Sequence, residues 1–445
     1  MANIIVAGGG NGGLVAAIKL AKAGFKVSLF ESKSKDDLGM AQTDAFDADT
    51  FSYADILPSP DFKRGANIIT FFPLDKNVAP LTIPALDELS FIVDRRDLAN
   101  YMFSLAEEAG VDIHYETAVK SPIILGNRVA GISTDKGDFY GDMIIDACGV
   151  SSPLRTNLPD ALLVNREIKK YDVIYSYRAY FDKNKSAPDP ETSYNLYLRN
   201  NGNEGFSWLI TEEDRTDALI CRFYRPDDSE ILEALRNIQE ENPQMGMRLT
   251  EGGGRAIIPI CQPLGILVCD GYAAVGDSAF MTIPLKGSGI TFSFKAGTIL
   301  AETIINDLNG FYDTESLWAY QSRFFKEIGS GACRLAILKN ILPYLTATEV
   351  SDIFRLGLVT TEEISAVMTD KAAAILNKNG LTSLKNKIKI ASDNNTIKDI
   401  LSSLLVWLGK FTVIEASYPS KYDRKAAIKW VEKYNDFFDS IRKID

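Results

Sequence analysis

Residues 3–31 read NIIVAGGGNGGLVAAIKLAKAGFKVSLFE, and this stretch decides the fold. The apolar run at residues 4–7 is typical of a buried parallel strand, and the glycine-rich segment after it leads into a helix with one apolar face. Gly24 is placed to end that helix, and Lys26–Phe30 has the character of the next strand. The pattern therefore predicts a strand–helix–strand unit of a parallel sheet.

The glycine-rich loop and the acid that follows it predict a dinucleotide ligand. Gly8, Gly10 and Gly13 give the spacing G-x-G-x-x-G. In this spacing the first glycine permits a tight turn, the second lets the backbone approach a pyrophosphate, and the third lets the helix pack on the strand. The N-terminal amides and the dipole of the helix then face negative charge. Glu31, about 20 residues further on, is placed to accept hydrogen bonds from ribose hydroxyls and disfavours a 2′-phosphate. FAD or NAD is therefore expected rather than NADP.

Composition excludes several other classes of protein. The 445 residues suffice for two or three domains, and the net charge of −11 makes nucleic acid an unfavourable partner. Five scattered cysteines without a C-x-x-C pair indicate neither a disulfide framework nor a zinc site. The single histidine, His114, argues against a Ser-His-Asp triad and a histidine-rich metal centre, so no metal is expected. The chain lacks a run of about 18 apolar residues and begins directly with its first strand, which predicts a cytoplasmic protein without a membrane span.

The remainder of the chain changes character twice. Residues 170–225 alternate aromatic and polar side chains at period two, which predicts an antiparallel sheet with one buried face. The run at residues 143–147 and the run that precedes Gly276 return to the parallel-strand type, and a helix is expected to open at Ser288 or Gly289. Gly252, Gly253 and Gly254 lead into a strand-like run and not a helix, so we interpret them as a turn. From residue 310 onward the pattern is helical.

These patterns predict an α/β fold with an α+β substrate domain. A Rossmann-like FAD-binding domain with a parallel sheet is expected over residues 1–165 and 250–310, with residues 60–95 contributing to the substrate side. An antiparallel-sheet substrate domain is expected over 166–249, and a helical C-terminal region over 311–445. That last region holds 19 Lys and Arg against 16 Asp and Glu, so it carries a slight excess of positive charge.

Two further segments carry a resemblance to a known family. Residues 146–155, DACGVSSPLR, are similar to the pattern D-A-D-G-x-x-S-x-x-R, and residues 276–290 combine G-D-S-A with P-L-K-G-S-G-I. With the first loop, the chain resembles the FAD-dependent oxidoreductases of the para-hydroxybenzoate hydroxylase superfamily, and within it the geranylgeranyl reductase family. Cys148 stands where the family usually has aspartate, which puts in doubt the polar contacts of that loop. Asp277 can accept from a ribityl hydroxyl, and backbone amides at the start of the following helix can stabilise negative charge on the flavin.

Two shorter matches leave alternatives open. Val93-Asp94-Arg95 resembles the family's entry to a helix, which implies that Arg95 faces the cofactor, although a solvated or salt-bridged arginine has the same pattern. Phe206, Trp208 and Ile210 resemble the Y-x-W-x-F-P of prenyl reductases, with substitutions at three of its positions, and are also similar to the W-x-W-x-I-P of flavin halogenases. Period-two spacing puts the three side chains on one face of a strand, either lining an apolar channel or packed in the core.

The resemblance implies a set of site residues and a reaction class. The cofactor-binding residues are Gly8, Gly10, Asn11, Gly12, Gly13, Glu31, Arg95, Val119, Gly149, Gly276, Asp277, Pro284, Gly287, Ser288, Gly289 and Ile290, and the substrate residues are Phe206 and Trp208. Reduced FAD is expected to transfer hydride to a carbon–carbon double bond of an isoprenoid or other apolar substrate. The proton donor stays open among a carboxylic acid, tyrosine, cysteine and water, so no catalytic residue is assigned.

Several functional alternatives remain at this stage. An aromatic hydroxylase or halogenase has the same fold, and a non-catalytic carrier such as the GDP dissociation inhibitors resembles FAD proteins without holding flavin. The electron donor is expected to be a reduced nicotinamide or ferredoxin, since a second dinucleotide loop is absent. The slightly basic C-terminal helices can either contact anionic lipid at a membrane surface or simply pack on the core.

Overall fold

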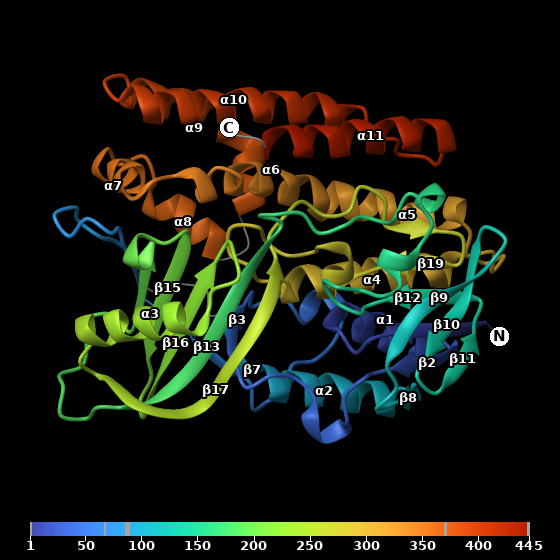
Figure 1. The fold of residues 1–445 in the computed structure, drawn as a ribbon. Helices are drawn as coiled ribbons and strands as arrows, with labels where there is room; N and C mark the ends of the chain where they lie inside the picture. Colours follow the sequence, from blue (N-terminus) through green and yellow to red (C-terminus); the bar gives the residue numbers. More distant parts are fainter. Residues whose placement is uncertain (1, 66–67, 85–89, 369–371, 443–445) are drawn as a thin grey trace.

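The computed structural model describes residues 2–65, 68–84, 90–368 and 372–442, with the backbone alone for 372–380. Two main sheets lie next to each other, and the helices of the C-terminal third lie across both (Figure 1). One sheet is mainly parallel, and the other is mainly antiparallel. The expected fold class, a Rossmann-like parallel sheet with an antiparallel sheet and a helical C-terminal region, is confirmed.

The parallel sheet is built around the first strand of the chain. Its order is β18-β19-β12-β1-β2-β8, and all neighbours pair in parallel except β18 with β19. β1 is apolar and buried on both faces, as a central parallel strand requires. The strands are β1 (Asn3–Ala7), β2 (Lys26–Phe30), β8 (Asp112–His114), β12 (Met143–Asp146), β18 (Val268–Cys269) and β19 (Tyr272–Ala274).

Two helices pack against each other beside this sheet at a point where both carry glycine. α1 (Asn11–Lys22) follows the glycine-rich loop, and α4 (Ile290–Asn306) follows Gly289, one residue later than the latest start expected. A Cβ on Gly297 of α4 would lie 2.3 Å from the carbonyl oxygen of Gly12. This contact brings the start of α1 close to the third predicted cofactor segment, residues 276–290. As predicted, α1 ends just before Gly24, which has φ +91°.

The antiparallel sheet has the order β17-β13-β16-β15-β14-β5-β6, and only β14 and β5 pair in parallel. The four strands expected from the aromatic alternation are β13 (Val173–Lys183), β14 (Tyr194–Leu198), β15 (Gly205–Thr211) and β16 (Arg215–Arg222). β5 (Ile69–Phe72), β6 (Leu81–Ile83) and β17 (Met245–Pro259) extend the sheet at its two ends. α3 (Asp228–Glu241) covers the outer face through a separate apolar cluster.

The turn predicted at Gly252 to Gly254 is wrong. β17 runs without interruption through these residues and pairs with β13 on both sides of them. The register shifts by one residue opposite Arg178 and Ala179, and Gly252 and Gly253 have φ of +81° and +80°. The glycines therefore form a β-bulge, because a single strand can absorb an extra residue where glycine allows a positive φ.

Two smaller sheets complete the N-terminal part of the chain. β9 (Val119–Leu125), β10 (Arg128–Thr134) and β11 (Gly137–Tyr140) form one, in which β10 and β11 pair as an antiparallel hairpin. β3 (Thr43–Phe46), β4 (Lys63–Gly65) and β7 (Ser90–Asp94) form the other. β3 lies within the long connection after Glu31, and β7 leads directly into α2 (Arg95–Glu108). These elements bring the connection and Arg95 to the junction of the two main sheets.

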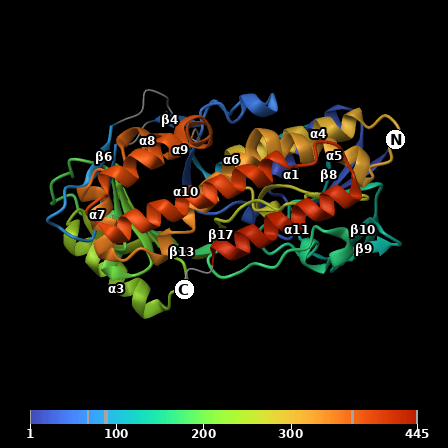
Figure 2. The same ribbon diagram turned by 90° about the horizontal axis from the view of Figure 1, so that it is seen from above.

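The C-terminal region is helical, as expected. A π-helical segment at Phe325–Gly329 joins its first two helices, and the last two, α10 and α11, run along the top of the molecule (Figures 1 and 2). The helices are α5 (Thr314–Phe324), α6 (Ser330–Lys339), α7 (Ala347–Arg355), α8 (Thr361–Met368), α9 (Ala372–Ile390), α10 (Asn395–Ala416) and α11 (Arg424–Ile441). Within the described part of the chain, none of these helices combines the length and the apolar character that a membrane crossing needs. The domain boundaries given above stay a prediction.

Candidate functional site

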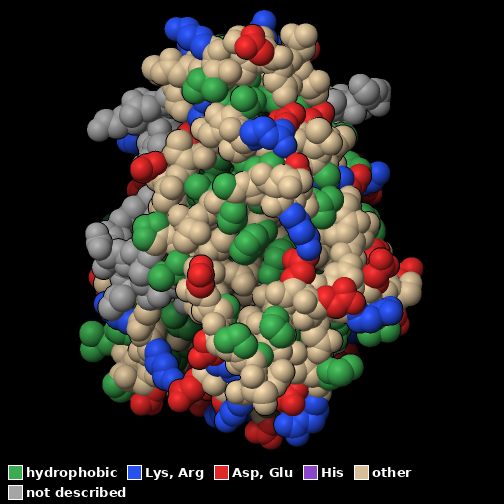
Figure 3. Space-filling model, turned by 90° about the vertical axis from the view of Figure 1, so that its left-hand side faces the viewer, with side chains coloured by type: hydrophobic (Ala, Val, Ile, Leu, Met, Phe, Trp, Pro, Cys, Tyr) green, Lys and Arg blue, Asp and Glu red, His purple; other side chains and the backbone are tan. Residues whose placement is uncertain are grey.

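A cavity of about 1930 Å³ lies where the two main sheets and the C-terminal helices meet. Ligand pockets usually have about 300–1,000 Å³, so this cavity has room for a dinucleotide and a second ligand. It extends from the glycine-rich loop past the inner face of the antiparallel sheet to residues of α6, α7, α8, α9 and α10. At the end of the molecule formed by that sheet, hydrophobic side chains show between charged side chains of both signs (Figure 3).

One end of the cavity is the glycine-rich loop. Gly8 has φ +89°, and a Cβ there would lie 2.5 Å from the carbonyl oxygen of Ala147, so only glycine fits. α1 begins at Asn11, and no side chain among the described residues caps its first turn. Its first amides therefore keep their hydrogen-bonding capacity for a ligand, which is the arrangement that binds pyrophosphate.

Glu31 lies beside the loop at the end of β2. Its Oε2 accepts from the backbone N–H of Gly9 at 2.9 Å, and its Oε1 accepts from the N–H of Lys33 at 2.9 Å and the hydroxyl of Ser32 at 3.1 Å. These bonds fix the carboxylate at the rim of the cavity. A ribose hydroxyl can donate to the remaining lone pairs, as the sequence spacing predicts.

The segment at residues 146–155 has a largely structural inner part. Asp146 is fully buried and accepts from the Ser152 hydroxyl and, at 2.6 Å, from the Tyr272 hydroxyl. Arg155 is also fully buried, and its guanidinium donates to the carbonyl oxygens of Val150 and Ser278. The polar residues of this pattern thus tie the loop to β19 and the third segment that follows it, while residues 147–151 line the cavity.

Cys148 stands at the position where the pattern D-A-D-G-x-x-S-x-x-R has its second aspartate. Its Sγ lies 3.3 Å from the carbonyl oxygen of Ala7, and burial, reinforced by the charge of Asp146, raises the pKa of the thiol. A neutral thiol that donates to β1 replaces a carboxylate here. This contact supports the doubt that the sequence raised about the polar role of this loop.

The third segment, residues 276–290, lines the cavity next to the glycine-rich loop. Asp277 lies in a 3₁₀ turn (Gly276–Ala279), close to Gly289, which is the N-cap of α4. Within the described chain, α4 also starts without a side-chain cap, so its first amides are open to a ligand. Burial raises the pKa of Asp277, and the charge of Arg95 opposes the rise. The segment therefore offers an acceptor and a helix N-terminus side by side.

The structure brings the predicted site residues together around one cavity. Gly8, Gly10, Asn11, Gly12, Glu31, Arg95, Val119, Gly149, Gly276, Asp277, Pro284, Gly287, Ser288, Gly289, Ile290, Phe206 and Trp208 all line it. Gly13 lies behind the lining, where a Cβ would come 2.6 Å from that of Ala147, so its place is the contact between α1 and β12. The roles of these residues in binding stay predictions.

The lining fits an FAD molecule. Two helix N-termini with free amides, a carboxylate beside the glycine-rich loop and a second acid near α4 lie along the wall of one continuous cavity. These groups match a pyrophosphate, an adenosine ribose, a ribityl chain and the polar edge of a flavin. FAD would supply hydride-transfer chemistry at its isoalloxazine ring.

A cluster of four charged residues lies between this cofactor end and the antiparallel sheet. Arg178 on β13 binds Asp217 on β16 through two nitrogens, with Nε 2.9 Å from Oδ1, and both side chains are almost completely buried. Arg178 also lies 3.5 Å from Asp44, which pairs with Arg95. Burial would raise the pKa of Asp44, but the charges of Arg95 and Arg178 outweigh it and hold the pKa below its ordinary value.

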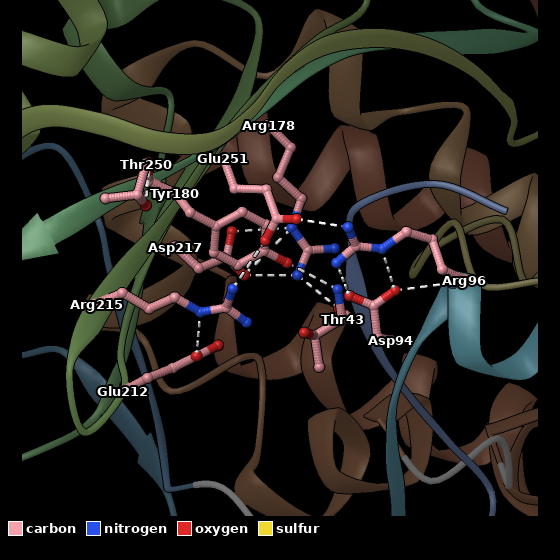
Figure 4. Close-up of polar contacts among 10 residues, drawn as sticks. All are labelled: Thr43, Asp94, Arg96, Arg178, Tyr180, Glu212, Arg215, Asp217, Thr250 and Glu251. Carbon is pink, nitrogen blue, oxygen red and sulfur yellow. Dashed lines mark hydrogen bonds and ion pairs between the residues drawn. The ribbon is translucent and has the colours of Figure 1, made fainter. Parts of the chain in front are cut away.

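The charged cluster continues toward solvent through a second set of contacts. The Arg178 guanidinium donates to the carbonyl oxygen of Thr43, and the Thr43 N–H donates to the Tyr180 hydroxyl at 2.7 Å (Figure 4). Glu251 pairs with both Arg96 and Arg215, at 2.6 and 3.1 Å. Asp94, Glu212 and Thr250 complete the network that Figure 4 shows. The network joins β3, α2 and three strands of the sheet, so it fixes the sheet against the cofactor end.

Arg178 and Asp217 of the charged cluster lie on β13 and β16. The half of the antiparallel sheet formed by β14 and β15 is apolar where it faces the cavity. Strand register places Tyr194, Ile210 and Asp217 in one row across β14, β15 and β16. The next row contains Leu196 and Trp208 and ends in Arg178. Each row thus changes from apolar on β14 and β15 to charged on β16 or β13. Phe206, Trp208 and Ile210 lie on one face, as their spacing predicts, and all three line the cavity.

Helices from the C-terminal region close the apolar side of the cavity. Its lining here is dominated by leucine, isoleucine and valine, with one ion pair between Glu363 on α8 and Lys387 on α9. The apolar lining residues are Leu335, Leu338, Leu345, Val350, Ile353, Phe354, Ile364, Val367, Leu384, Leu401, Leu404 and Leu408. These side chains form the roof of the cavity, a name we keep for this set.

Sequence analysis missed both the charged cluster and the roof. Arg178 and Asp217 stand within strands that are otherwise aromatic and aliphatic, and a charge inside such a run was the available signal. The roof residues follow ordinary helical periodicity, which does not tell a cavity lining from a packed core. Only the arrangement of the helices in space shows that these residues line a cavity and do not form a packed core.

The fold and the cavity are similar to those of FAD-dependent oxidoreductases. Residues 6–77 match the family model of the NAD(P)-binding Rossmann-like domain. The chain has a TM-score of 0.60 and 16% identity with the myxobacterial chondrochloren halogenase CndH, an FAD-dependent halogenase, over 83% of this chain and 90% of that one. At this identity the likeness establishes the fold.

Two further comparisons point to geranylgeranyl reductases. The digeranylgeranylglycerophospholipid reductase of Sulfolobus acidocaldarius is 20% identical over 425 residues, which cover 89% of this chain and 92% of the relative. A geranylgeranyl bacteriochlorophyll reductase-like protein from Thermoplasma acidophilum has a TM-score of 0.69 and 18% identity, over 85% of this chain and 98% of that one. The resemblance predicted from the sequence is confirmed.

Proposed function

We propose that the protein is an FAD-dependent reductase of carbon–carbon double bonds in an isoprenoid lipid. The observation that carries the proposal is the continuity of one cavity from the dinucleotide-type loop to an apolar chamber between the sheet and the roof. The similarity to reductases whose names specify geranylgeranyl lipids supports the substrate class. An isoprenoid chain is apolar and long, and the lining of the chamber suits it in both respects.

The chain's own residues bind, orient and exclude water in this reaction. The amides that start α1 and α4, with Glu31 and Asp277, would hold FAD along one wall. Phe206 and Trp208 would position the substrate chain by apolar contact, because their side chains line the chamber. The roof keeps this part of the cavity apolar, and excluding water favours hydride transfer over competing reactions.

Arg199 supports a substrate with an anionic end. It lines the cavity at the end of β14, and among the described residues no carboxylate pairs with it. Its Nε and Nη1 are buried without an acceptor, and the contact of its Nη2 with Gly202 is long, at 3.4 Å. Nε and Nη1 are enclosed by the protein, so an anionic group on the lipid would offset the charge of the guanidinium from the cavity side without contacting these two atoms.

The proposal also covers the electron donor of the flavin and the cellular location of the protein. A reduced nicotinamide or ferredoxin would deliver electrons to the flavin, and stopped-flow mixing of the oxidised protein with each donor decides between them. A cytoplasmic protein that contacts the membrane surface would reach a lipid substrate directly. Co-sedimentation of the protein with anionic vesicles, compared with neutral vesicles, tests that contact.

An anaerobic half-reaction tests the function. The purified yellow protein is reduced with dithionite, and geranylgeranylated lipids with anionic or neutral head groups are added while flavin absorbance is followed. The expected result is reoxidation of the flavin by the unsaturated lipid, with no reoxidation by the fully saturated lipid. The anionic lipid should react at lower concentration than the neutral one. Absence of reoxidation by every unsaturated lipid contradicts the proposal.

The same experiment distinguishes the proposed reductase from two alternative functions of proteins with this fold. Similarity to an FAD-dependent halogenase keeps an aromatic hydroxylase or halogenase as the alternative. That alternative predicts that reduced flavin reacts with oxygen in the presence of a phenolic substrate and is inert to alkenes. A carrier without catalytic function predicts a colourless protein that binds lipid and no flavin.

A further inference from the structure

Tyr194 is a buried tyrosine whose hydroxyl group opens into the apolar chamber of the cavity. It lies on β14, its side chain is only 8% exposed, and it lines the cavity. Its hydroxyl has no hydrogen-bond partner among the described residues and is not one of the fully enclosed polar atoms. A buried hydroxyl normally finds a partner in the protein, so one that opens unpartnered into a cavity indicates a ligand contact.

The surroundings of Tyr194 are apolar on one side and charged on the other. Its ring meets that of Trp208 edge to face, with 5.5 Å between centroids, and it belongs to an apolar cluster with Ile69 and Ile83. Across the row lies Asp217, and Arg178 lies over the Trp208 ring at 5.5 Å. The hydroxyl therefore stands at the boundary between the apolar and the charged halves of the sheet.

Five of the carboxylic acids that line the cavity already have another partner or a predicted role. Asp44, Asp217 and Glu363 are each engaged in an ion pair with arginine or lysine. Glu31 and Asp277 lie among the predicted cofactor-binding groups. Tyr194 is the one tyrosine in the described cavity lining.

We propose that Tyr194 is the proton donor in the reduction of the alkene, an assignment that rests on the proposed function. The O–H proton of Tyr194 bonds to one carbon of the double bond through the π electron pair, and the O–H electron pair stays on the phenolate oxygen. A hydride from reduced flavin bonds to the other carbon, so the alkene gains two electrons and the flavin loses two. The phenolate then regains a proton from water.

The electrostatic setting keeps this acid protonated. Burial raises the pKa of Tyr194, and the charge of Arg178 opposes the rise while Asp217, Cys221 and Asp44 reinforce it. The helices that pack on this cluster contribute Phe354, Ile364 and Met368 to it, and the charged residues Glu363 on α8 and Lys387 on α9 are paired with each other. The phenol is therefore neutral over the whole neutral range, and the rate of the alkene step should be flat from about pH 6 to pH 9.

Tyr194→Phe is the direct test, because it removes the O–H and keeps the ring against Trp208. Tyr197→Phe is the matched control, since Tyr197 is on the same strand but accepts from Asn242 Nδ2 at 2.7 Å on the other face. In the anaerobic half-reaction, Tyr194→Phe should reoxidise with alkene about 10²- to 10⁴-fold more slowly than wild type. Its reoxidation by oxygen, its affinity for saturated lipid and its flavin content should be unchanged. The solvent deuterium isotope effect on the alkene step should be present in wild type and in Tyr197→Phe.

A binding measurement without turnover supports the same assignment. In oxidised protein labelled with ¹³C at the tyrosine phenol carbon, addition of unsaturated lipid should shift one NMR signal, and that signal should be missing in Tyr194→Phe. If wild type is inert to every alkene, the proposed function fails and the assignment with it. If wild type reacts and Tyr194→Phe reacts about as fast, or if the Tyr194 signal does not respond to lipid, only the assignment is overturned.

Discussion

The two halves of the antiparallel sheet face the same cavity, and only one of them presents a buried ion pair to it. β14 and β15 present Leu196, Phe206 and Trp208, whereas β16 and β13 present the buried pair of Asp217 and Arg178. Both halves belong to one sheet with continuous register, so the change occurs between adjacent strands. The difference indicates that one sheet has two separate structural roles. Its charged half is fastened to the cofactor end, and its apolar half leaves room for a ligand.

The largest expected effect comes from breaking the charged half. Arg178→Leu leaves Asp217 buried without its partner, which should lower the free energy of unfolding by about 3–5 kcal/mol. The double variant Arg178→Leu/Asp217→Leu removes both charges and should be less destabilised than the single variant, because no unpaired charge remains. Urea unfolding of wild type, Arg178→Leu, Asp217→Leu and the double variant measures this. A double variant that loses as much as the sum of both single changes contradicts the role given to the pair.

A smaller effect is expected in the apolar half, and it should appear in binding. Trp208→Ala removes apolar area from the chamber wall and should weaken the binding of a saturated isoprenoid lipid by about 10- to 30-fold, roughly 1.5–2 kcal/mol. Leu209→Ala is the control, because Leu209 is its neighbour on β15 but packs into the outer cluster under α3. That variant should lose stability and keep its affinity. Titration calorimetry measures the affinities, and urea unfolding measures the stabilities. Equal affinities for Trp208→Ala and wild type would contradict the proposal that the chamber binds the isoprenoid chain.

The smallest effect is the pH dependence of the charged half. The pKa of Asp44 would be raised by burial but is held below its ordinary value by Arg95 and Arg178. A carboxyl whose pKa is lower in the folded state contributes stability above its unfolded pKa of about 3.9, and the contribution is lost as pH falls through the folded pKa. Wild type should therefore lose stability below about pH 4 more steeply than Asp44→Asn. Denaturation midpoints from pH 6 down to pH 2.5 give the two slopes, and parallel slopes contradict the assignment.

The cofactor end was predictable from the sequence because its information is local. Residues 3–31 hold a strand, a loop, a helix and a second strand in one continuous run, and the structure forms β1, α1 and β2 from it. The motif at residues 276–290 likewise lies in one short stretch. Each segment carries its own glycine spacing and apolar run, so register and order follow from the chain itself.

The substrate end was less predictable because its features depend on distant contacts. Asp44 and Arg178 are 134 positions apart, and nothing near either residue indicates that they meet. Gly252 and Gly253 resemble a turn locally, but pairing with β13 makes them a bulge within a long strand. Tertiary pairing overrides the local signal in both cases.

The roof also has a consequence for how such a protein can diverge. Its side chains all come from one contiguous stretch, α6 to α10, whereas the cofactor end is assembled from three separate segments that precede it. Substitutions in that single stretch alter the length and width of the chamber and leave the dinucleotide end intact. Substrate range and cofactor choice are thus encoded in different parts of the chain, and selection can adjust one while conserving the other.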